Sequence, residues 1–411
     1  MVSKRMGLTA GALVAVPLAL GPGAMAASTP AAASSGGTGA GVVTRVASAA
    51  ADAGTTKPSV MRANRTAQQV LSSMTLQQRV GELLMMGNPA TNPYLVTEQY
   101  IQKYHVGSVV LTGRSTYGTA HTNWLVGRLQ SYTGTASTGG TKLVVAADQE
   151  GGYVQVLQGP GFSRMPTALY QGTHWSLGTI RSNAATWGGQ LKSAGVNLDL
   201  APVMDTVSQS FAPYNAPIGY YDREFGYTPY DVLMRGNAFA NGLRDAGMGV
   251  TIKHFPGLGR VRGNTDTTSG VTDTVTTRYS SSIQPFAVGV RSGAEAVMVS
   301  TAYYKKIAPN PAAFSTSIMG TMLRGDLGFT GVIISDDLGN AKQVQAWSPG
   351  TRAVLFLQHG GNLILTVNPS TVPAMYNAVL SLAESSSSFR SKVNNSALHV
   401  LQLKARLGLI G

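Results

Sequence analysis

Cysteine is absent from this chain of 411 residues, and several other chemical groups are scarce. The absence excludes disulfide bonds, thiol catalysis and cysteine-ligated metals. The six histidines show no ligand spacing along a helix and no H-E-x-x-H motif, so we expect no catalytic metal and no other cofactor. A G-x-S-x-G nucleophile motif is also missing. The segment GLGRVRG lacks the ending of a Walker phosphate loop, which disfavours phosphate binding.

Long apolar runs are missing after the first 26 residues, so we expect no stable membrane insertion of the mature chain. Residues 1–26 are typical of a secretion signal: Lys4 and Arg5 precede the apolar segment GLTAGALVAVPLAL, and an A-x-A cleavage pattern ends at Ala26. An N-terminal membrane anchor is the alternative, disfavoured because the apolar segment is short. Residues 27–57, mostly Ala, Ser, Thr and Gly, predict a flexible linker. Residues 58–411 are expected to fold and to act outside the cell.

Acidic residues are few: 18 Asp and Glu stand against 31 Lys and Arg, a formal net charge of +13. Removal of the signal takes away two basic residues and leaves +11. Such an excess favours anionic partners, although it also serves solubility. The basic residues are scattered rather than clustered with aromatics, so we expect no nucleic-acid binding. For a secreted protein, anionic cell-wall polymers are the better candidate, and association with the cell wall is the corresponding expectation.

Short apolar runs recur along the chain between longer amphipathic or polar segments. The runs that we interpret as strands cover residues 83–87, 108–112, 143–148, 196–203, 249–255, 296–301, 332–337 and 363–367. Continuous apolar strands with long connections indicate a parallel sheet covered by helices. Eight such units predict an α/β fold, a (β/α)8 TIM-type barrel with one catalytic domain. A doubly wound sheet is the alternative.

Polar residues stand at the carboxyl ends of these runs. They are Asp148, Asp205, Lys253, His254, Thr301, Asp336 and Asp337. In a barrel the active site lies at that end of the strands. Four of them, Asp148, Lys253, His254 and Asp336, are expected to converge with Arg223 and Asp266 from the loops on a site for hydroxyl-rich substrates, which charged hydrogen bonds hold well. Cleaving a glycoside needs one group to attack or stabilise the anomeric carbon and one to protonate the leaving oxygen. Trp175, Trp187 and Trp347 are candidates for stacking on the substrate, or else they are packed in the core.

Six segments, in this order, resemble glycoside hydrolase family 3. They are LVVAADQEGGYVQ, GVNLDLAPVMD, IGYYDREFG, IKHFPGLG, PAAFS and LRGDLGFTGVIISDDL. The resemblance runs from about Met74 to Gly411 and is closest to the single-domain β-N-acetylglucosaminidases that trim peptidoglycan fragments. It implies a TIM barrel of the family's N-terminal type, no second domain, and retention of configuration through a covalent glycosyl-enzyme.

The resemblance also implies roles for individual residues. Asp336, the first aspartate of SDDL, resembles the nucleophile, and the strand pattern agrees because Val332, Ile334 and Asp336 share one face. Asp337 faces the other way and is expected to orient the loop. The residues that the resemblance assigns to substrate binding are Asp148, Arg223, Lys253 and His254.

The loop after KHFPG departs from the family pattern. Leu258 stands in place of the second histidine of KHFPGHG, and Thr268 replaces the acid/base histidine of an Asp-x-His pair. An alcohol is too weak an acid to protonate a leaving group near neutral pH. Asp266 can do so if burial or a neighbouring carboxylate raises its pKa, and it is therefore the predicted acid. Weaker candidates are Asp273 and His254.

Two further positions depart from the family. Tyr153 and Val156 stand where relatives often carry arginine, the second of which helps to bind the sugar. The leading prediction is nevertheless a secreted, retaining enzyme that removes terminal β-linked N-acetylglucosamine from peptidoglycan- or chitin-derived sugars. The alternatives are a sugar-binding protein with weakened catalysis, and a transglycosylase or phosphorylase.

Overall fold

Eight parallel strands carry the fold of residues 67–410, the part of the chain that this computed structural model describes. The strands are β1 (Leu84–Pro89), β2 (Ser108–Thr112), β3 (Val144–Ala147), β6 (Leu198–Asp199), β7 (Gly249–Phe255), β9 (Ala296–Val299), β11 (Val332–Ser335) and β12 (Ile364–Thr366). Each lies within or overlaps one of the eight predicted strands. The predicted signal and linker, residues 1–57, lie outside the described residues.

The strands follow one another around the sheet in chain order, and the sheet closes on itself. The order is β11-β9-β7-β6-β3-β2-β1-β12. β1 pairs with β12 in the register Leu84↔Ile364, and a bridge between Ile334 and Leu363 joins β12 to β11. The sequence prediction of a (β/α)8 barrel is therefore confirmed, and the doubly wound alternative is wrong, because an open sheet would leave two edges.

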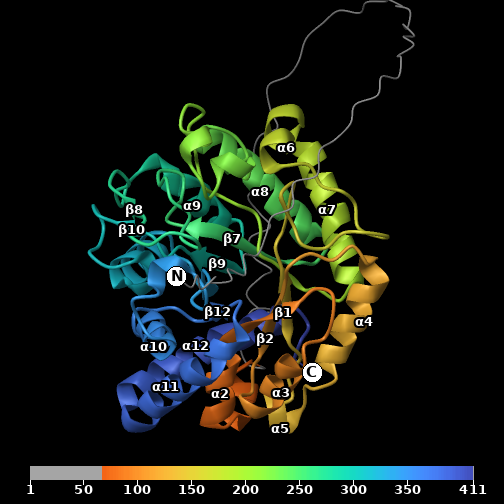
Figure 1. The fold of residues 1–411 in the computed structure, drawn as a ribbon, viewed down its shortest axis with the longest axis vertical. Helices are drawn as coiled ribbons and strands as arrows, with labels where there is room; N and C mark the ends of the chain where they lie inside the picture. The colour runs from red at the N-terminus through yellow and green to blue at the C-terminus, as the bar shows by residue number, and fades with distance from the viewer. Residues whose placement is uncertain (1–66, 411) are drawn as a thin grey trace, which may run out of the picture. The chain divides into compact units, whose positions relative to one another are not determined.

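Helices connect successive strands and surround the barrel (Figure 1). They are α2 (Leu76–Glu82), α3 (Leu95–Lys103), α4 (Gly118–Gln130), α5 (Thr135–Thr138), α6 (Ala168–His174), α7 (Leu177–Ser193), α8 (Pro229–Asp245), α9 (Gln284–Arg291), the π-helix η5 (Ser317–Asp326), α10 (Pro349–Gln358), α11 (Val372–Ser385) and α12 (Ser387–Arg406). Several begin where a hydroxyl accepts a hydrogen bond from a backbone N–H of the first turn, as Thr75, Ser176, Thr228 and Ser348 do. No helix of residues 67–410 is long and apolar enough to cross a membrane.

The end of the described chain packs against its beginning. In Figure 1, α11 and α12 (blue) lie beside α2 (orange). The Nζ atom of Lys404 on α12 lies 2.6 Å from Oε1 of Glu82, and both side chains are fully buried. Lys404 also donates to Oγ1 of Thr141 at 3.0 Å. This ion pair ties α12 to the chain just before β1, at the end of the barrel where the strands begin.

Candidate active site

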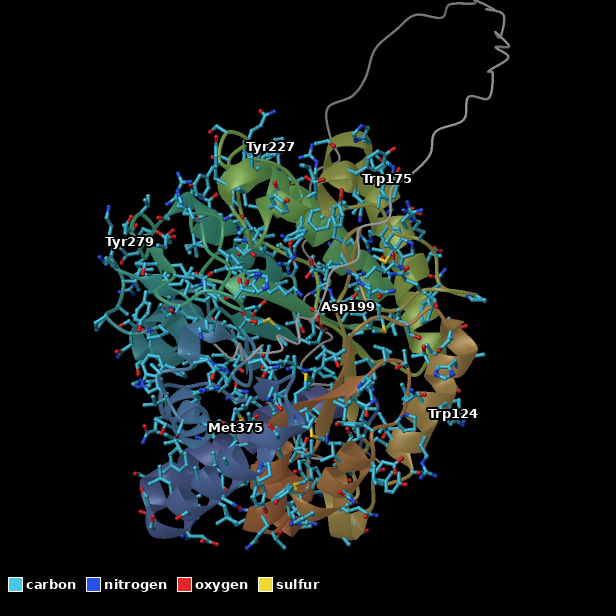
Figure 2. The ribbon with its side chains drawn as sticks, viewed as in Figure 1. Trp124, Trp175, Asp199, Tyr227, Tyr279 and Met375 are labelled. Atoms are coloured by element: carbon cyan, nitrogen blue, oxygen red, sulfur yellow. The ribbon has the colours of Figure 1, made fainter. Side chains whose placement is uncertain are left out.

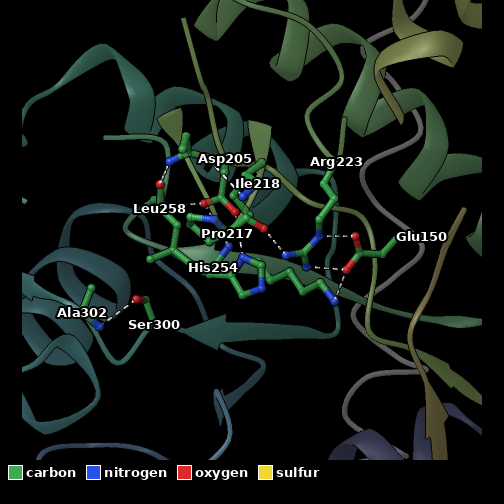
Figure 3. Close-up of polar contacts among 12 residues, drawn as sticks. Glu150, Asp205, Pro217, Ile218, Arg223, His254, Leu258, Ser300 and Ala302 are labelled. Atoms are coloured by element: carbon green, nitrogen blue, oxygen red, sulfur yellow. Dashed lines mark hydrogen bonds and ion pairs between the residues drawn. The ribbon is translucent and has the colours of Figure 1, made fainter. Parts of the chain in front are cut away.

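A buried cluster of charges lies at the carboxyl ends of the strands (Figure 3). Lys253, near the end of β7, places Nζ 2.5 Å from Oδ1 of Asp148 and 2.6 Å from Oε1 of Glu150. Arg223 grips the same Glu150 with two hydrogen bonds, at 2.8 Å from Nε and 2.7 Å from Nη2. The structure thus brings together Asp148, Arg223 and Lys253, three of the four predicted binding residues.

Charge balance in this cluster fixes the ionised forms. Burial alone would raise the pKa of Glu150, but the neighbouring charges of Arg223 and Lys253 outweigh it and lower the pKa to about 2. Burial alone would lower the pKa of Lys253, yet Asp148 and Glu150 hold it above its ordinary value. The Asp148 side chain is 34% exposed, against 2% for Lys253. Asp148 is therefore the member of the cluster that is open to a ligand.

His254 is held by a carboxylate that the sequence analysis did not assign to the site. Its Nδ1 atom lies 2.7 Å from Oδ2 of Asp205, which is fully buried. Oδ1 of Asp205 also accepts from the backbone N–H groups of His254, at 3.3 Å, and of Leu258, at 2.7 Å. With Nδ1 committed to Asp205, the Nε2 atom of His254 is the ring nitrogen left to meet a substrate.

Asp336 and Asp337 follow β11 and have different surroundings. Oδ1 of Asp336 accepts only the backbone N–H of Asp337, at 2.8 Å, among the described residues. Asp337 instead accepts the backbone N–H groups of Gly339, Asn340 and Val367, at 2.8, 2.9 and 3.0 Å. Asp337 therefore shapes the loop, as the strand pattern predicted, and Asp336 keeps acceptor capacity for chemistry.

The loop that bears Asp266 is anchored to the segment after β11. Gln343 accepts from the backbone N–H of Val271 at 2.9 Å and donates to its carbonyl oxygen at 3.1 Å. The carbonyl oxygen of Asp266 accepts from the N–H of Lys342 at 3.1 Å. The backbone N–H of Asp266 donates to Oδ1 of Asn264 at 2.9 Å. These contacts fix the backbone of the loop that carries Asp266 against the segment that follows Asp336.

The pKa of Asp266 is raised to about 7. Enclosure among the groups of the mouth is the largest cause, followed by the negative charges of Asp336 and Asp337, while the charge of His254 works in the opposite direction. The Asp266 side chain nevertheless keeps an exposed surface, so water screens part of this effect. A carboxyl group whose pKa is raised by the charge of a neighbouring carboxylate meets one requirement for a general acid.

Three of the positions that depart from the family pattern, Leu258, Thr268 and Val156, differ in their surroundings. Leu258 is buried, with 2% of its surface exposed, and belongs to the core. Thr268 is exposed, and its backbone N–H donates to the carbonyl oxygen of Asn264 at 2.8 Å, so that it closes a turn. Val156 is half-buried against the core. None of the three supplies a titratable group to the mouth.

The three tryptophans considered for stacking pack against other side chains. Trp187 is buried, and the half-buried Trp175 and Trp347 pack on Trp187 and Phe314 at ring-centroid distances of 6.1 and 5.3 Å, as in the alternative considered for them (Trp175 in Figure 2). Every exposed tyrosine of residues 67–410 instead lies between the carboxyl end of a strand and the first turn of the next helix. These are Tyr94, Tyr117, Tyr153, Tyr170, Tyr214, Tyr220, Tyr230 and Tyr279.

Two residues of the cluster escaped the sequence analysis as site residues. Glu150 lies two positions after Asp148, and its pairing with both Arg223 and Lys253 depends on loops from three different strands. Asp205 was noted as a strand-end carboxylate without a partner. The signal that could have revealed both is a count of charges, since Lys253 and Arg223 buried at one mouth need carboxylates beside them.

The titratable groups of this mouth are of the kinds used for acid–base chemistry and for binding hydroxyl groups. Residues 67–410 contain no group of three or more His, Asp or Glu side chains placed to hold a metal ion. A barrel mouth that joins strand-end aspartates to a charged clamp has the kinds of group that cleavage of a glycoside requires.

Comparisons with known proteins agree with this class. The model for the N-terminal domain of glycosyl hydrolase family 3 matches residues 75–403. The solved β-N-acetylhexosaminidase of Beutenbergia cavernae DSM 12333 is 48% identical, with a TM-score of 0.80 over 80% of this chain and 98% of that one. The family 3 β-N-acetylglucosaminidase of Paenibacillus sp. str. FPU-7 is 26% identical, with a TM-score of 0.74 over 82% of this chain and 64% of that one.

Curated relatives give the same result. A β-hexosaminidase of Xylella fastidiosa (strain M23) is 35% identical over 244 residues, which cover 58% of this chain and 70% of the relative. A β-hexosaminidase of Xanthomonas campestris pv. campestris (strain B100) is 33% identical over 243 residues, 57% of this chain and 71% of the relative. The chain belongs to glycosyl hydrolase family 3, and it is a glycosidase that acts on O-glycosyl bonds.

Proposed function

We propose that this protein is a secreted, retaining β-N-acetylhexosaminidase that removes terminal β-linked N-acetylglucosamine from peptidoglycan- or chitin-derived sugars. The observation that carries the proposal is the pairing of Asp336, open at the end of β11, with Asp266, whose pKa its charge helps to raise, in a family 3 barrel. The names of the relatives supply the N-acetylhexosamine specificity.

The first chemical step forms a glycosyl-enzyme. An oxygen of the Asp336 carboxylate attacks the anomeric carbon while the bond from that carbon to the leaving oxygen breaks. The leaving oxygen takes the proton of Asp266, so the leaving sugar departs as an alcohol. The charged clamp holds the ring: Asp148 accepts from sugar hydroxyls, and Lys253 and Arg223 keep Asp148 and its neighbours in place.

The second step returns the enzyme to its starting state. The negative charge of Asp336 is one of the causes that raise the pKa of Asp266. Esterification removes this charge, so the ionised form of Asp266 is favoured in the glycosyl-enzyme. It then accepts a proton from water, and the water oxygen attacks the anomeric carbon as the bond to Asp336 breaks. The product keeps the β configuration because two displacements occur.

The test compares an activated aryl β-N-acetylglucosaminide with the matching aryl β-glucoside and with the β-linked disaccharide of N-acetylglucosamine. Hydrolysis of both N-acetylglucosaminides, with little turnover of the glucoside, supports the proposal. Binding without turnover of either would leave a sugar-binding protein. A reaction that inorganic phosphate accelerates, with sugar phosphate as product, would indicate a phosphorylase.

Export is a separate part of the proposal. It is supported by the signal-like residues 1–26 and by the net charge of +11 that remains for binding anionic cell-wall polymers after their removal. Mass spectrometry of protein recovered outside the cytoplasm should find an N-terminus at Ala27. An intact Met1 terminus on that material contradicts cleavage.

A further inference from the structure

Three tyrosine side chains form an aromatic surface beside the charged clamp; we call Tyr153, Tyr220 and Tyr221 the tyrosine platform. The rings of Tyr153 and Tyr221 lie 5.9 Å apart between centroids, and those of Tyr221 and Tyr220 lie 5.0 Å apart. Tyr153 is 59% exposed and Tyr220 is 66% exposed. Rings that pack on one another edge to face and still present this much surface are available to stack on a ligand.

The platform is continuous with the residues that grip the sugar. Tyr153 lies three residues after Glu150, and Tyr221 lies two residues before Arg223. Glu150 and Arg223 are joined by two hydrogen bonds of 2.7 and 2.8 Å, so the two segments that carry the tyrosines are locked together at their bases. The platform therefore borders the clamp on the open side of the barrel.

Tyr153 is presented by a rigid turn. It connects β4 (Gln149–Gly151) to β5 (Val154–Gln155), and Gly151 and Gly152 have φ angles of 102° and 57°, which favour glycine. Arg114 donates to the carbonyl oxygens of Tyr153, at 2.5 Å, and of Gln155, at 3.3 Å. A ring on a fixed turn loses little conformational freedom when it binds a ligand.

Tyr220 and Tyr221 are tied to the loop that carries the acid. They belong to the short helix η2 (Gly219–Tyr221), and the N–H groups of Gly219 and of the preceding Ile218 donate to Oδ1 of the buried Asn215. Nδ2 of the same Asn215 donates to the carbonyl oxygens of Leu258, at 2.8 Å, and Val261, at 2.7 Å. These two residues begin the loop that leads to Asp266, so the platform and the acid share one support.

We propose that the tyrosine platform is a second sugar subsite, which stacks on the leaving-group sugar of an oligosaccharide. The proposal rests on the function proposed above. The acid must reach the leaving oxygen, so the leaving sugar lies on the side of the Asp266 loop, where Asn215 also fixes Tyr220 and Tyr221. Sugar rings present apolar C–H faces, and exposed aromatic rings bind such faces. The enzyme therefore selects glycans over small N-acetylglucosaminides.

The test uses two substrates with the same N-acetylglucosamine but different leaving groups. One is the β-linked disaccharide of N-acetylglucosamine, and the other is N-acetylglucosaminyl fluoride, whose leaving group has no ring. Tyr153→Ala and Tyr221→Ala should each lower kcat/KM for the disaccharide by about tenfold and leave the fluoride within about twofold of wild type. Tyr153→Phe keeps the ring and should retain disaccharide cleavage.

Tyr279→Ala is the matched control, because Tyr279 is 82% exposed and lies at the edge of the described unit (Figure 2). It should change neither substrate. Unchanged disaccharide cleavage in both platform variants, or equal losses with both substrates, overturns the proposed subsite. A wild-type enzyme that turns over neither substrate instead contradicts the proposed function, so the two failures are distinguishable.

Discussion

Replacing Asp266 by alanine removes the proposed proton donor and should affect substrates according to their leaving groups. A nitrophenol leaves with little protonation, whereas a sugar alcohol requires a full proton. General acid catalysis contributes about 10²- to 10⁴-fold to a rate, so Asp266→Ala should lower kcat/KM for the disaccharide by that factor. For the aryl glycoside, kcat/KM should fall by less than about tenfold, because it reports the first step.

The raised pKa of Asp266 also sets the pH dependence. The acid works in its protonated form, which persists up to a pKa of about 7 and is lost as the pH rises through that value. Above pH 7, kcat/KM for the disaccharide should therefore fall by about tenfold for each pH unit, and this limb should vanish in Asp266→Ala. Screening of the exposed carboxyl moves the limb to lower pH without changing its direction.

Steady-state kinetics from pH 5 to pH 9 on both substrates provides the measurement. Thr268→Ala, a change two residues away on the same loop, should leave the balance between substrates unaltered. Thr268→His, which rebuilds an imidazole acid, should shift the balance towards the disaccharide. Undiminished disaccharide cleavage by Asp266→Ala refutes the assignment and moves the proton donor to His254, another loop or water.

Three further changes test the supports of the site and the fold. Asp205→Asn removes the charge that orients His254, and it should raise KM about tenfold or more with a smaller change in kcat. Its Tm should fall by no more than a few degrees. Kinetic constants equal to those of wild type refute the positioning role. Lys404→Met leaves Glu82 buried without its partner, so it should lower the free energy of unfolding, measured by denaturant titration, by about 3–5 kcal/mol. Adding Glu82→Leu to this variant should recover much of the lost stability. Glu224 is fully buried, neither of its carboxylate oxygens has a hydrogen-bond partner among residues 67–410, and burial raises its pKa to about 7. Because the folded state favours the protonated form, this contribution to stability is fully present below the ordinary pKa of 4.5 and is lost as the pH rises from there through about 7. Glu224→Gln should therefore be more stable than wild type at pH 8 by up to about 3 kcal/mol and close to it at pH 4; a difference that does not change with pH contradicts the reasoning.

Strand positions followed from the sequence because burial on both faces leaves a continuous apolar run. β7 is buried at all seven residues, and its predicted and observed bounds are identical. The predicted strand at 196–203 is observed at Leu198–Asp199, and beyond Pro202, which has no backbone N–H for a ladder, an isolated bridge joins Val203 to Lys253. The residue patterns therefore placed the eight strands, but they overstated the lengths of five of them, most of all the one at 196–203.

Contacts made by loops could not be predicted from such residue patterns. That Asp148 and Lys253 would meet followed from their strand ends, but the double pairing of Glu150 depends on a turn and on Arg223 from another loop. Loop conformation has no residue period from which it can be read. The same limit hid the tyrosine platform, since exposure of Tyr153 is set by the Gly151–Gly152 turn.

The proposed retaining mechanism through Asp336 is tested most directly by trapping its covalent intermediate. The enzyme would be quenched by acid during turnover of an activated N-acetylglucosaminide, digested, and its peptides sequenced by mass spectrometry. We expect one N-acetylhexosamine on the peptide that contains Asp336, a β-configured first product, and neither adduct nor turnover in Asp336→Asn, a loss of several orders of magnitude. An adduct on another residue, or an α-configured first product, contradicts the mechanism.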